Sequence, residues 1–265
     1  MNKRTIGPLL AVAMVAALAG CENSTGPGLE GTQAVSLSFG VSGGSAAPGA
    51  SLFAGELELN DGVHTLVIQS TELVLKEIEF ERVESTGCDS DIGDDDCEEY
   101  ETGPFLVTLD MAGGVSQEIT AQVDTGTYDE IEFKIHKTED ADVAFLADNP
   151  GFAEISIRVT GTYDGDDFVF TTDTDEEKEL NLASPLIVTE TSGPVNVTLT
   201  IDVSTWFVDL GGMLVDPRTA NKGEPNESLV EENIKTSIDG FRDDDHDGVP
   251  HDDDGDEDDD SGTGS

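Results

Sequence analysis

Apolar and polar residues alternate with a period of two along most of the chain between residues 33 and 209. Successive side chains of a β-strand point to opposite faces of a sheet, so this alternation predicts strands with one covered face and one wet face. Gly, Asp and Asn separate the runs, and no helical period lies between them. The ten or eleven runs are AVSLSFGV, VHTLVIQ, TELVLKEIEFERV, PFLVTLD, QEITAQV, YDEIEFKIHK, FAEISIRVTGTY, DFVFTTDT, KELNL, PLIVTE and PVNVTLTIDV.

Short strands at this spacing are typical of a sandwich or barrel rather than of alternating strand and helix units. We therefore expect an all-β fold over residues 33–215, an antiparallel β-sandwich of the immunoglobulin-like or transthyretin-like kind. A domain of about 180 residues buries a sizeable core, and Trp206 and Phe207 at the end of the last strand should belong to it. The run YDEIEFKIHK places Glu130, Glu132, Lys134 and His136 together on the wet face.

Three junctions between runs resemble hairpin turns. An Asp-Gly pair stands at residues 61–62 and another at residues 164–165, and glycine supplies the positive φ that a tight turn demands. The third junction uses Gly126 to enter the next strand. Within LVLKEIEFERV the apolar phase slips after Leu75, which predicts a bulge or bend near Glu77.

Residues 216–242 change character and predict a loop followed by one short α-helix. Asn226 is a candidate N-cap for a helix from about Glu227 to Asp239, with acids early and Lys235 late, as the helix dipole prefers. A loose apolar stripe should dock this helix on the sandwich. The stripe consists of Leu229, Val230, Ile234, Ile238 and Phe241.

The first twenty residues form a secretory signal pattern. Residues 1–4 (MNKR) are positively charged, and the apolar run that follows is too short to span a bilayer as a stable helix. The run ends in LAGC, which resembles the lipobox of bacterial lipoproteins; the alternative is an ordinary signal peptide with a chance cysteine. The resemblance implies cleavage before Cys21 and acylation of its thiol. Residues 21–32 are rich in Gly, Ser, Thr and Pro and are typical of a flexible tether.

Several acyl chains on Cys21 would hold the chain firmly on a membrane, because each buried methylene contributes about 0.8 kcal/mol. We therefore expect the protein in the cell envelope, anchored to a membrane and facing the periplasm or the exterior. The outer membrane is the expected site, although Glu22 does not decide between the two membranes.

An exported chain meets a thiol-oxidising compartment, which bears on the two remaining cysteines, Cys88 and Cys97. We expect them to form a disulfide, which would close a loop of about ten residues and stabilise the fold by about 2.7 kcal/mol. A two-cysteine metal site is the alternative, but no histidine lies nearby in the sequence to complete it.

The formal charge is −46, from 58 acids against 12 bases. Such a charge excludes nucleic acid as a partner, because phosphate recognition needs basic residues. Two explanations remain open: local cation binding, and adaptation to salty surroundings in which carboxylates keep the surface hydrated. The spread of acids over the whole chain favours the second explanation for most of them. It does not account for the C-terminal tail, residues 243–265, where 12 of the 58 acids fall between positions 243 and 260.

In the stretch DDDHDGVPHDDD at residues 243–254, the acids and the glycine are spaced as in a calcium-binding loop. It resembles EF-hand-like loops and, more closely, the loops of thrombospondin type 3 repeats, although His251 stands where those repeats have Asp. Calcium takes six to eight oxygen ligands, and alternate residues of a tight turn can direct carboxylates to one point. A solvated acidic tail is the alternative, and residues 256–260 should be disordered. The candidate ligands are Asp243, Asp245, Asp247, the main-chain carbonyl of Val249, and Asp254.

Two other acidic segments are weaker candidates for metal binding. CDSDIGDDDC at residues 88–97 lacks the phase of a calcium loop and fits a solvated hairpin tip better. TTDTDEEKEL at residues 171–180 fits a polar strand face or a turn.

The sequence contains no recognisable catalytic motif. It has no Gly-x-Ser-x-Gly elbow, no His-Glu-x-x-His helix, no phosphate-binding glycine loop and no free nucleophilic thiol. A hydrolytic carboxylate pair is conceivable, but nothing selects one among 58 acids. His64 and His136 fall on predicted strands, where an exposed imidazole is the ordinary interpretation. We expect a protein that is not an enzyme.

The chain resembles a broad group of uncharacterised bacterial lipoproteins whose extracytoplasmic β-sandwich is a domain of unknown function. The resemblance lies in LVLKEIEFERV, ITAQVDTGTYDEIEFKI, VTGTYDGDDFVF and the block from DVSTWFVDLGGMLVDP to PNESLVEENIKTSIDGFRDDDHDG. It implies fold and location only. The resulting hypothesis is a lipid-anchored, non-catalytic envelope protein in surface structure, adhesion or contact with a cell-surface protein, with calcium ordering the tail. The alternative is a lipoprotein that binds a small ligand or a glycan.

Overall fold

The computed structural model describes residues 32–41, 50–53, 55–83, 100–111, 114–189 and 195–242 of the 265-residue chain. The predicted signal peptide and tether, with Cys21, lie outside the described residues. The same holds for the predicted disulfide, Cys88–Cys97, and for the acidic tail from residue 243 onward. The candidate calcium ligands of that tail are therefore outside as well: Asp243, Asp245, Asp247, Val249 and Asp254.

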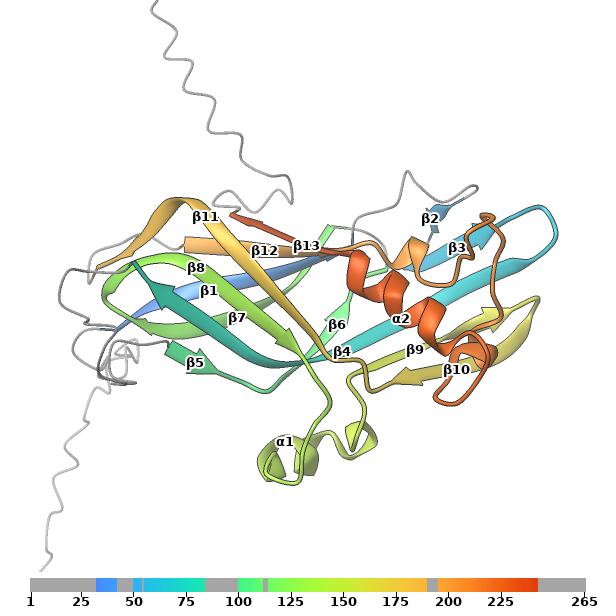
Figure 1. The fold of residues 1–265 in the computed structure, drawn as a ribbon, viewed down its shortest axis with the longest axis horizontal. Helices are drawn as coiled ribbons and strands as arrows, with labels where there is room; N and C mark the ends of the chain where they lie inside the picture. Colours follow the sequence, from blue (N-terminus) through green and yellow to red (C-terminus); the bar gives the residue numbers. More distant parts are fainter. Residues whose placement is uncertain are drawn as a thin grey trace, which may run out of the picture. The chain divides into compact units, whose positions relative to one another are not determined.

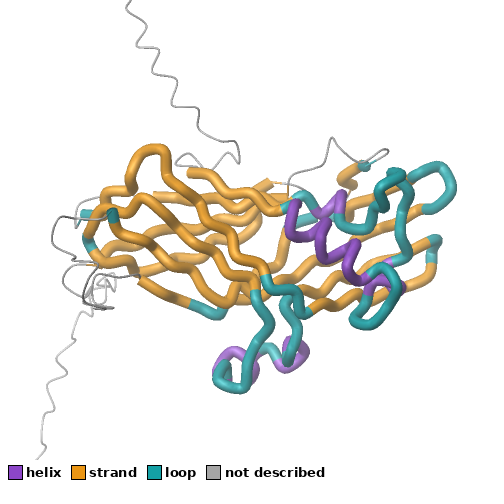
Figure 2. Tube along the Cα trace, in the orientation of Figure 1, coloured by secondary structure: helices purple, strands orange, loops and turns teal. Residues whose placement is uncertain are grey.

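Strands dominate the described part of the chain (Figure 1; Figure 2). They are β1 (Thr32–Val41), β2 (Ser51–Phe53), β3 (Glu56–Asn60), β4 (Thr65–Arg82), β5 (Tyr100–Thr102), β6 (Phe105–Leu109), β7 (Gly114–Asp124), β8 (Gly126–Ile135), β9 (Ile157–Tyr163), β10 (Asp166–Thr172), β11 (Glu176–Val188), β12 (Val195–Ile201) and β13 (Ile238–Arg242). The helical elements are α1 (Val143–Asp148), α2 (Glu227–Thr236) and the short 3-10 helices η2 (Pro150–Phe152), η3 (Val203–Thr205) and η4 (Pro217–Ala220).

The strands form two sheets. The smaller sheet has the order β13-β12-β1-β7, and the larger sheet is built around β4. The predicted all-β class is therefore confirmed, but the expectation of purely antiparallel pairing is wrong at one place. Strands β1 and β12 run parallel, with Val35 opposite Val195 and Val41 opposite Ile201. A parallel pair needs a long crossover, and here almost the whole domain lies between the two strands.

The 18-residue strand β4 organises the larger sheet. Along one edge it pairs first with β9 and then with β8, and β11 pairs with the far edge of β8. Along its other edge β4 pairs in turn with β3, β6 and β5. One strand therefore spans the full length of the sheet, and side chains from both halves of the sheet are fixed relative to it.

Two bulges interrupt β4. The pairing register shifts between Leu75 and Glu77, which confirms the bulge predicted near Glu77 from the slip in apolar phase. A second shift lies between Ile68 and Ser70, opposite β9. A Cβ atom on Gly161 would lie 1.9 Å from the Val67 carbonyl oxygen, so only glycine allows the backbone to approach the second bulge.

The inward faces of the two sheets share one core. Leu37 and Phe39 of β1 and Leu199 of β12 belong to the same buried cluster as the inward side chains of the larger sheet. Trp206 and Phe207 are fully buried, as predicted, and Phe207 makes edge contacts with the aromatic rings of β10. Each fully buried aliphatic or aromatic side chain contributes about 1.5–3 kcal/mol, so this cluster is the main source of stability.

Two of the three predicted turns are hairpins. Strands β3 and β4 are joined by residues 61–64, with Gly62 at φ 88°, and β9 and β10 by Asp164 and Gly165, with φ 53° and 86°. The third prediction is wrong, because β7 belongs to the smaller sheet and β8 to the larger one. The chain therefore crosses between sheets just before Gly126, where the Tyr128 hydroxyl donates to the carbonyl of Asp124.

Helix α2 begins at Glu227, as predicted, and buries Val230 and Ile234 against the core. Asn226 precedes it but does not cap it with its side chain, which donates instead to the Thr219 hydroxyl. The helix ends at Thr236 rather than at residue 239, because the following residues form β13 and pair with β12. The C-terminal part of the predicted apolar stripe is therefore a strand.

The segment between β8 and β9 contains a short helix that the pattern of the sequence does not predict. Helix α1 has no buried residue and lies on an excursion away from the sheets (Figure 1). The β4 bulge directs Lys76 to this excursion, where its ammonium lies 2.5 and 2.7 Å from the carboxylate oxygens of Asp142. The Asp142 side chain is only 8% exposed, so the ion pair is a well-shielded attachment point.

Candidate functional site

Three adjacent strands of the larger sheet place their outward side chains in aligned rows. The register sets Glu79, Glu132 and Glu179 directly across from one another on β4, β8 and β11. Neighbouring rows hold Glu77, Lys134 and Glu177 on one side, and Glu81, Glu130 and Asn181 on the other. Neighbouring strands lie about 4.8 Å apart, so these side chains are within reach of one another. We call the seven glutamates the carboxylate face: Glu77, Glu79, Glu81, Glu130, Glu132, Glu177 and Glu179.

Lys134 is the cation within these rows. Its ammonium nitrogen lies 3.3 Å from a carboxylate oxygen of Glu77, 3.5 Å from Glu132, 3.6 Å from Glu79 and 3.9 Å from Glu177. Burial opposes the charged ammonium, but the surrounding carboxylates, Glu77 first, raise the pKa of Lys134. In the three rows of described residues, Lys134 is the one cation beside seven glutamates, and these rows carry an excess of acidic groups.

Burial and mutual repulsion raise the pKa values of the central carboxylates. Burial, a hydrogen bond shared with Glu77 and the charge of Glu132 raise the pKa of Glu79 to about 7. Burial and the charge of Glu177 likewise raise the pKa of Glu132. Opposing carboxylates on neighbouring strands repel one another, so Glu79 is partly protonated near neutral pH when no metal ion is bound.

Three members of the face form a candidate metal-binding group. One carboxylate oxygen from each of Glu132, Glu177 and Glu179 lies within 4.8 Å of the others. The Glu132 side chain is 12% exposed, whereas that of Glu177 is 51% exposed, so an ion can reach the group from the β11 side. Three carboxylates supply up to six oxygens, which suits a hard divalent cation such as calcium.

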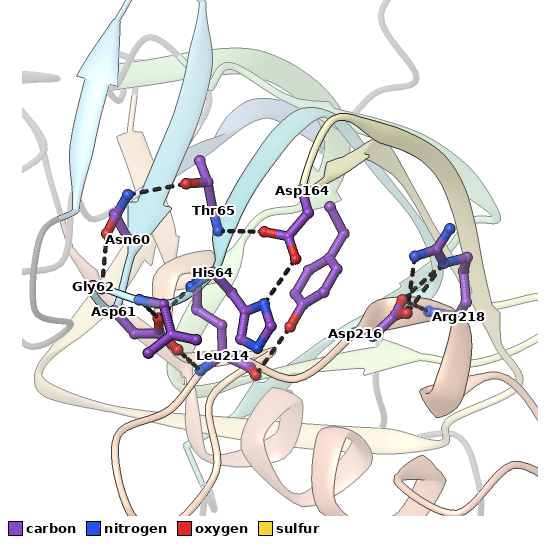
Figure 3. Close-up of polar contacts among 11 residues, drawn as sticks. Asn60, Asp61, Gly62, His64, Thr65, Asp164, Leu214, Asp216 and Arg218 are labelled. Carbon is purple, nitrogen blue, oxygen red and sulfur yellow. Dashed lines mark hydrogen bonds and ion pairs between the residues drawn. The ribbon is translucent and has the colours of Figure 1, made fainter.

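A second polar cluster lies at the end of the sheet where β4 begins (Figure 3). Asp61 accepts the backbone N–H groups of Val63 and His64 with one carboxylate oxygen and that of Leu214 with the other. These hydrogen bonds, first that from His64 and then that from Leu214, lower the pKa of Asp61 to about 2. Asp61 thereby joins the β3–β4 turn to a segment about 150 residues further along the chain.

His64 joins the same turn to the β9–β10 hairpin. Its Nδ1 atom lies 2.7 Å from a carboxylate oxygen of Asp164, and its ring stacks on Tyr163 with 5.2 Å between centroids. Asp164 also accepts the backbone N–H of Thr65, and the Tyr163 hydroxyl donates to the carbonyl of Leu214. We call this group the loop cluster: Asp61, His64, Tyr163, Asp164 and Leu214.

The two histidines predicted on strands lie just outside them. His64 is the last residue before β4, and His136 is the first after β8. Neither is a simple exposed imidazole, because His64 pairs with Asp164, and His136 has Nδ1 2.7 Å from the carbonyl oxygen of Lys137.

One of the two weaker acidic candidates of the sequence contributes most to the metal-binding group. Glu177 and Glu179 come from TTDTDEEKEL, the segment expected to be a polar strand face. That expectation describes their position on β11, and Glu130, Glu132 and Lys134 lie on the wet face of β8 as predicted. Strand β11 pairs with β8, and β8 pairs with β4, so three polar strand faces form one carboxylate face. No local sequence pattern predicts this pairing.

Comparisons of the chain with protein-family models, with curated proteins and with solved structures found no match. Among the described residues no helix is both long and apolar enough to cross a membrane.

Proposed function

We propose that this chain is a lipid-anchored, non-catalytic β-sandwich protein of the cell envelope that binds calcium through surface carboxylates. The observation that supports it is the carboxylate face, and within it the three oxygens of Glu132, Glu177 and Glu179 that lie within 4.8 Å of one another. The role would be in surface structure, adhesion or contact with another cell-surface protein, with calcium bridging acidic groups.

Electrostatics favour a divalent cation at this face. Two carboxylates 4 Å apart repel by about 1 kcal/mol even at the dielectric constant of water. Lys134 already contacts four carboxylates of the face, and it leaves Glu79 with a raised pKa. A bound calcium ion would remove this repulsion. The group offers only oxygen ligands, which suits calcium better than zinc, and flexible Glu side chains meet the irregular geometry of calcium more readily than the strict octahedron of magnesium.

Other parts of the proposal come from the sequence. The LAGC segment supports anchoring through Cys21, with the outer membrane as the proposed location. The spacing of acids and glycine in residues 243–254 supports a second calcium site in the tail. An immunoglobulin-like or transthyretin-like classification of the sandwich, and membership of the uncharacterised lipoprotein group, are part of the same proposal.

Calcium titration of the full-length chain in detergent, followed by calorimetry, tests the proposal. We expect dissociation constants of about 10⁻⁴–10⁻³ M, as in extracellular calcium modules. The double variant Glu132→Gln/Glu179→Gln should lose calcium binding at the carboxylate face and keep any calcium binding in the tail. The double variant Asp245→Ala/Asp247→Ala should do the reverse. Glu58→Gln, on the exposed face of β3, is the matched control and should bind as the wild type does.

A flat calorimetric trace for the wild type would refute calcium binding, and a face variant with unchanged binding would refute the face as a site. Anchoring is tested separately. Cys21→Ser should release the protein from membranes into the soluble fraction, whereas continued membrane association would contradict lipidation at this residue.

A further inference from the structure

The loop cluster holds one segment of the chain from two sides. The backbone N–H of Leu214 donates to Asp61 at 2.8 Å, and its carbonyl accepts from the Tyr163 hydroxyl at 3.4 Å. Asp61 belongs to the β3–β4 turn and Tyr163 to the β9–β10 hairpin. The peptide groups on both sides of Leu214 are therefore held by two different turns, in addition to the backbone bonds that the segment makes with residues 207–209.

Together with the Asp164 carboxylate, which accepts the N–H of Thr65, His64 joins the two turns to each other. Its ring bonds to Asp164 and stacks on Tyr163, both in the hairpin, while its backbone N–H donates to Asp61 in its own turn. Asp164 fastens the same junction through its backbone, because its N–H donates to the carbonyl of Thr65.

The charges around His64 are mainly negative. Asp61 of its own turn, Asp164 of the hairpin and Asp216 of the 209–220 segment all act on the imidazole, and the phenol of Tyr163 faces it directly. Arg218 is the nearby cation, but its guanidinium is occupied by Asp216, to which it donates from Nε at 2.9 and 3.2 Å and from Nη2 at 2.9 Å. The surroundings therefore favour the protonated imidazole.

We propose that His64 is a pH-responsive latch, which fixes the segment 209–216 to the two hairpin turns when it is protonated and loosens it when it loses its proton. A protonated His64 donates a charge-assisted hydrogen bond to Asp164, which is roughly twice as strong as a neutral one. A neutral His64 keeps that bond only in the tautomer with hydrogen on Nδ1. Its ring is 37% exposed, so protons exchange freely with solvent.

The hydrogen bond to Asp164 raises the pKa of His64 above its ordinary value of 6.5. A raised pKa in the folded state means that the latch is at full strength below about pH 6.5 and weakens as the pH rises through the folded-state value. The transition therefore falls above pH 6.5.

The latched segment carries exposed apolar side chains. Leu210 is fully exposed at the tip of a turn closed by Asp209, which accepts the N–H groups of Gly211 and Met213. Met213 itself is 40% exposed. The latch thus controls how rigidly this turn is held, which is the property that a change of pH would alter.

Hydrogen–deuterium exchange of the full-length chain in detergent tests the proposal. Between pH 6 and pH 8.5, after correction for the intrinsic exchange rate, the protection of peptides covering residues 209–216 should fall about two- to fivefold, the range of an exposed ion pair. His64→Gln removes the titrating group and should abolish this change with pH. His136→Gln is the matched control and should behave as the wild type, and a peptide in β12 reports global stability.

Each outcome decides for or against the latch. Constant protection of residues 209–216 in the wild type, or an equal fall in His64→Gln, would overturn it. A histidine NMR titration gives a second measurement that does not depend on the stability of a variant. The His64 resonance, assigned by its loss in His64→Gln, should titrate above pH 6.5 and return toward 6.5 in Asp164→Asn. A wild-type midpoint at or below 6.5 would also overturn the proposal.

Discussion

Replacing Glu79 with glutamine probes the cost of assembling the carboxylate face. Glutamine has the shape of a protonated glutamic acid and keeps its hydrogen-bonding capacity, but it cannot ionise. The Glu79 side chain is 15% exposed and lies across from Glu132 on the neighbouring strand. The substitution therefore removes one mutually repelling charge from the centre of the face while the packing stays the same.

The size of the effect follows from the pKa. Burial and the neighbouring acids Glu77 and Glu132 raise the pKa of Glu79 from 4.5 to about 7. One pKa unit corresponds to about 1.4 kcal/mol, so the ceiling is ~3 kcal/mol. Solvent screening and the lost attraction to Lys134 reduce this, and we expect a gain of about 1–2 kcal/mol in the free energy of unfolding at pH 8.

The dependence on pH gives the prediction its sign. Between about pH 4.5 and 7 the folded state binds more protons at Glu79 than the unfolded state does. Wild-type stability therefore falls as the pH rises through this window and stays low above it. Glu79→Gln removes the fall, so the variant should exceed the wild type at pH 8 and differ little from it at pH 4.5.

Urea unfolding at fixed ionic strength, with a chelator present, measures this difference. Trp206 is the single tryptophan of the chain and is fully buried, so its fluorescence reports the loss of the core. Glu58→Gln on β3 is the control and should show no comparable gain at pH 8. A Glu79→Gln protein that is less stable than the wild type at pH 8, or equally stabilised at both pH values, would refute the reasoning.

Three further substitutions test the packing of the fold by the same unfolding assay. Thr174→Val should raise the free energy of unfolding by about 1 kcal/mol, because the buried Thr174 hydroxyl has no hydrogen-bond partner among the described residues; a loss would show that the hydroxyl is paired. Asp142→Asn should cost about 2–4 kcal/mol at pH 7 by leaving the shielded Lys76 ammonium without its counter-charge. Although burial opposes ionisation, hydrogen bonds from Glu139 and Lys76 lower the pKa of Asp142, so this cost should vanish as the pH falls through the lowered value. Gly161→Ala should cost about 3 kcal/mol or more, since its Cβ would meet the Val67 carbonyl at 1.9 Å, whereas Gly165→Ala, in open space at φ 86°, should cost only about 1–2 kcal/mol.

Local patterns were sufficient to predict much of the fold. Period-two alternation identified the strands because a half-buried strand must alternate, and the slip after Leu75 located a real bulge. The Asp-Gly pairs marked hairpins because few other residues tolerate the required backbone angles. The predicted hairpin at Gly126 failed because glycine permits a turn without specifying which sheet the next strand joins.

The candidate sites depended on pairing between distant strands, which local patterns do not contain. Glu132 and Glu179 are 47 positions apart and meet only because β11 pairs with β8. His64 and Asp164 are separated by 100 positions and meet because β4 pairs with β9. The acid-rich runs of the sequence indicated sites within single segments, whereas the seven glutamates of the carboxylate face come two or three at a time from three strands.

The length of β4 determines how its two ends communicate. From the latch histidine to the centre of the acidic array is about 15 residues, or roughly 50 Å of extended backbone. At physiological ionic strength, interactions between exposed charges are largely screened beyond about 8 Å. Protonation of His64 therefore has no direct electrostatic effect on a cation bound at the carboxylate face. The two sites should respond to pH and to calcium independently unless the strand itself moves.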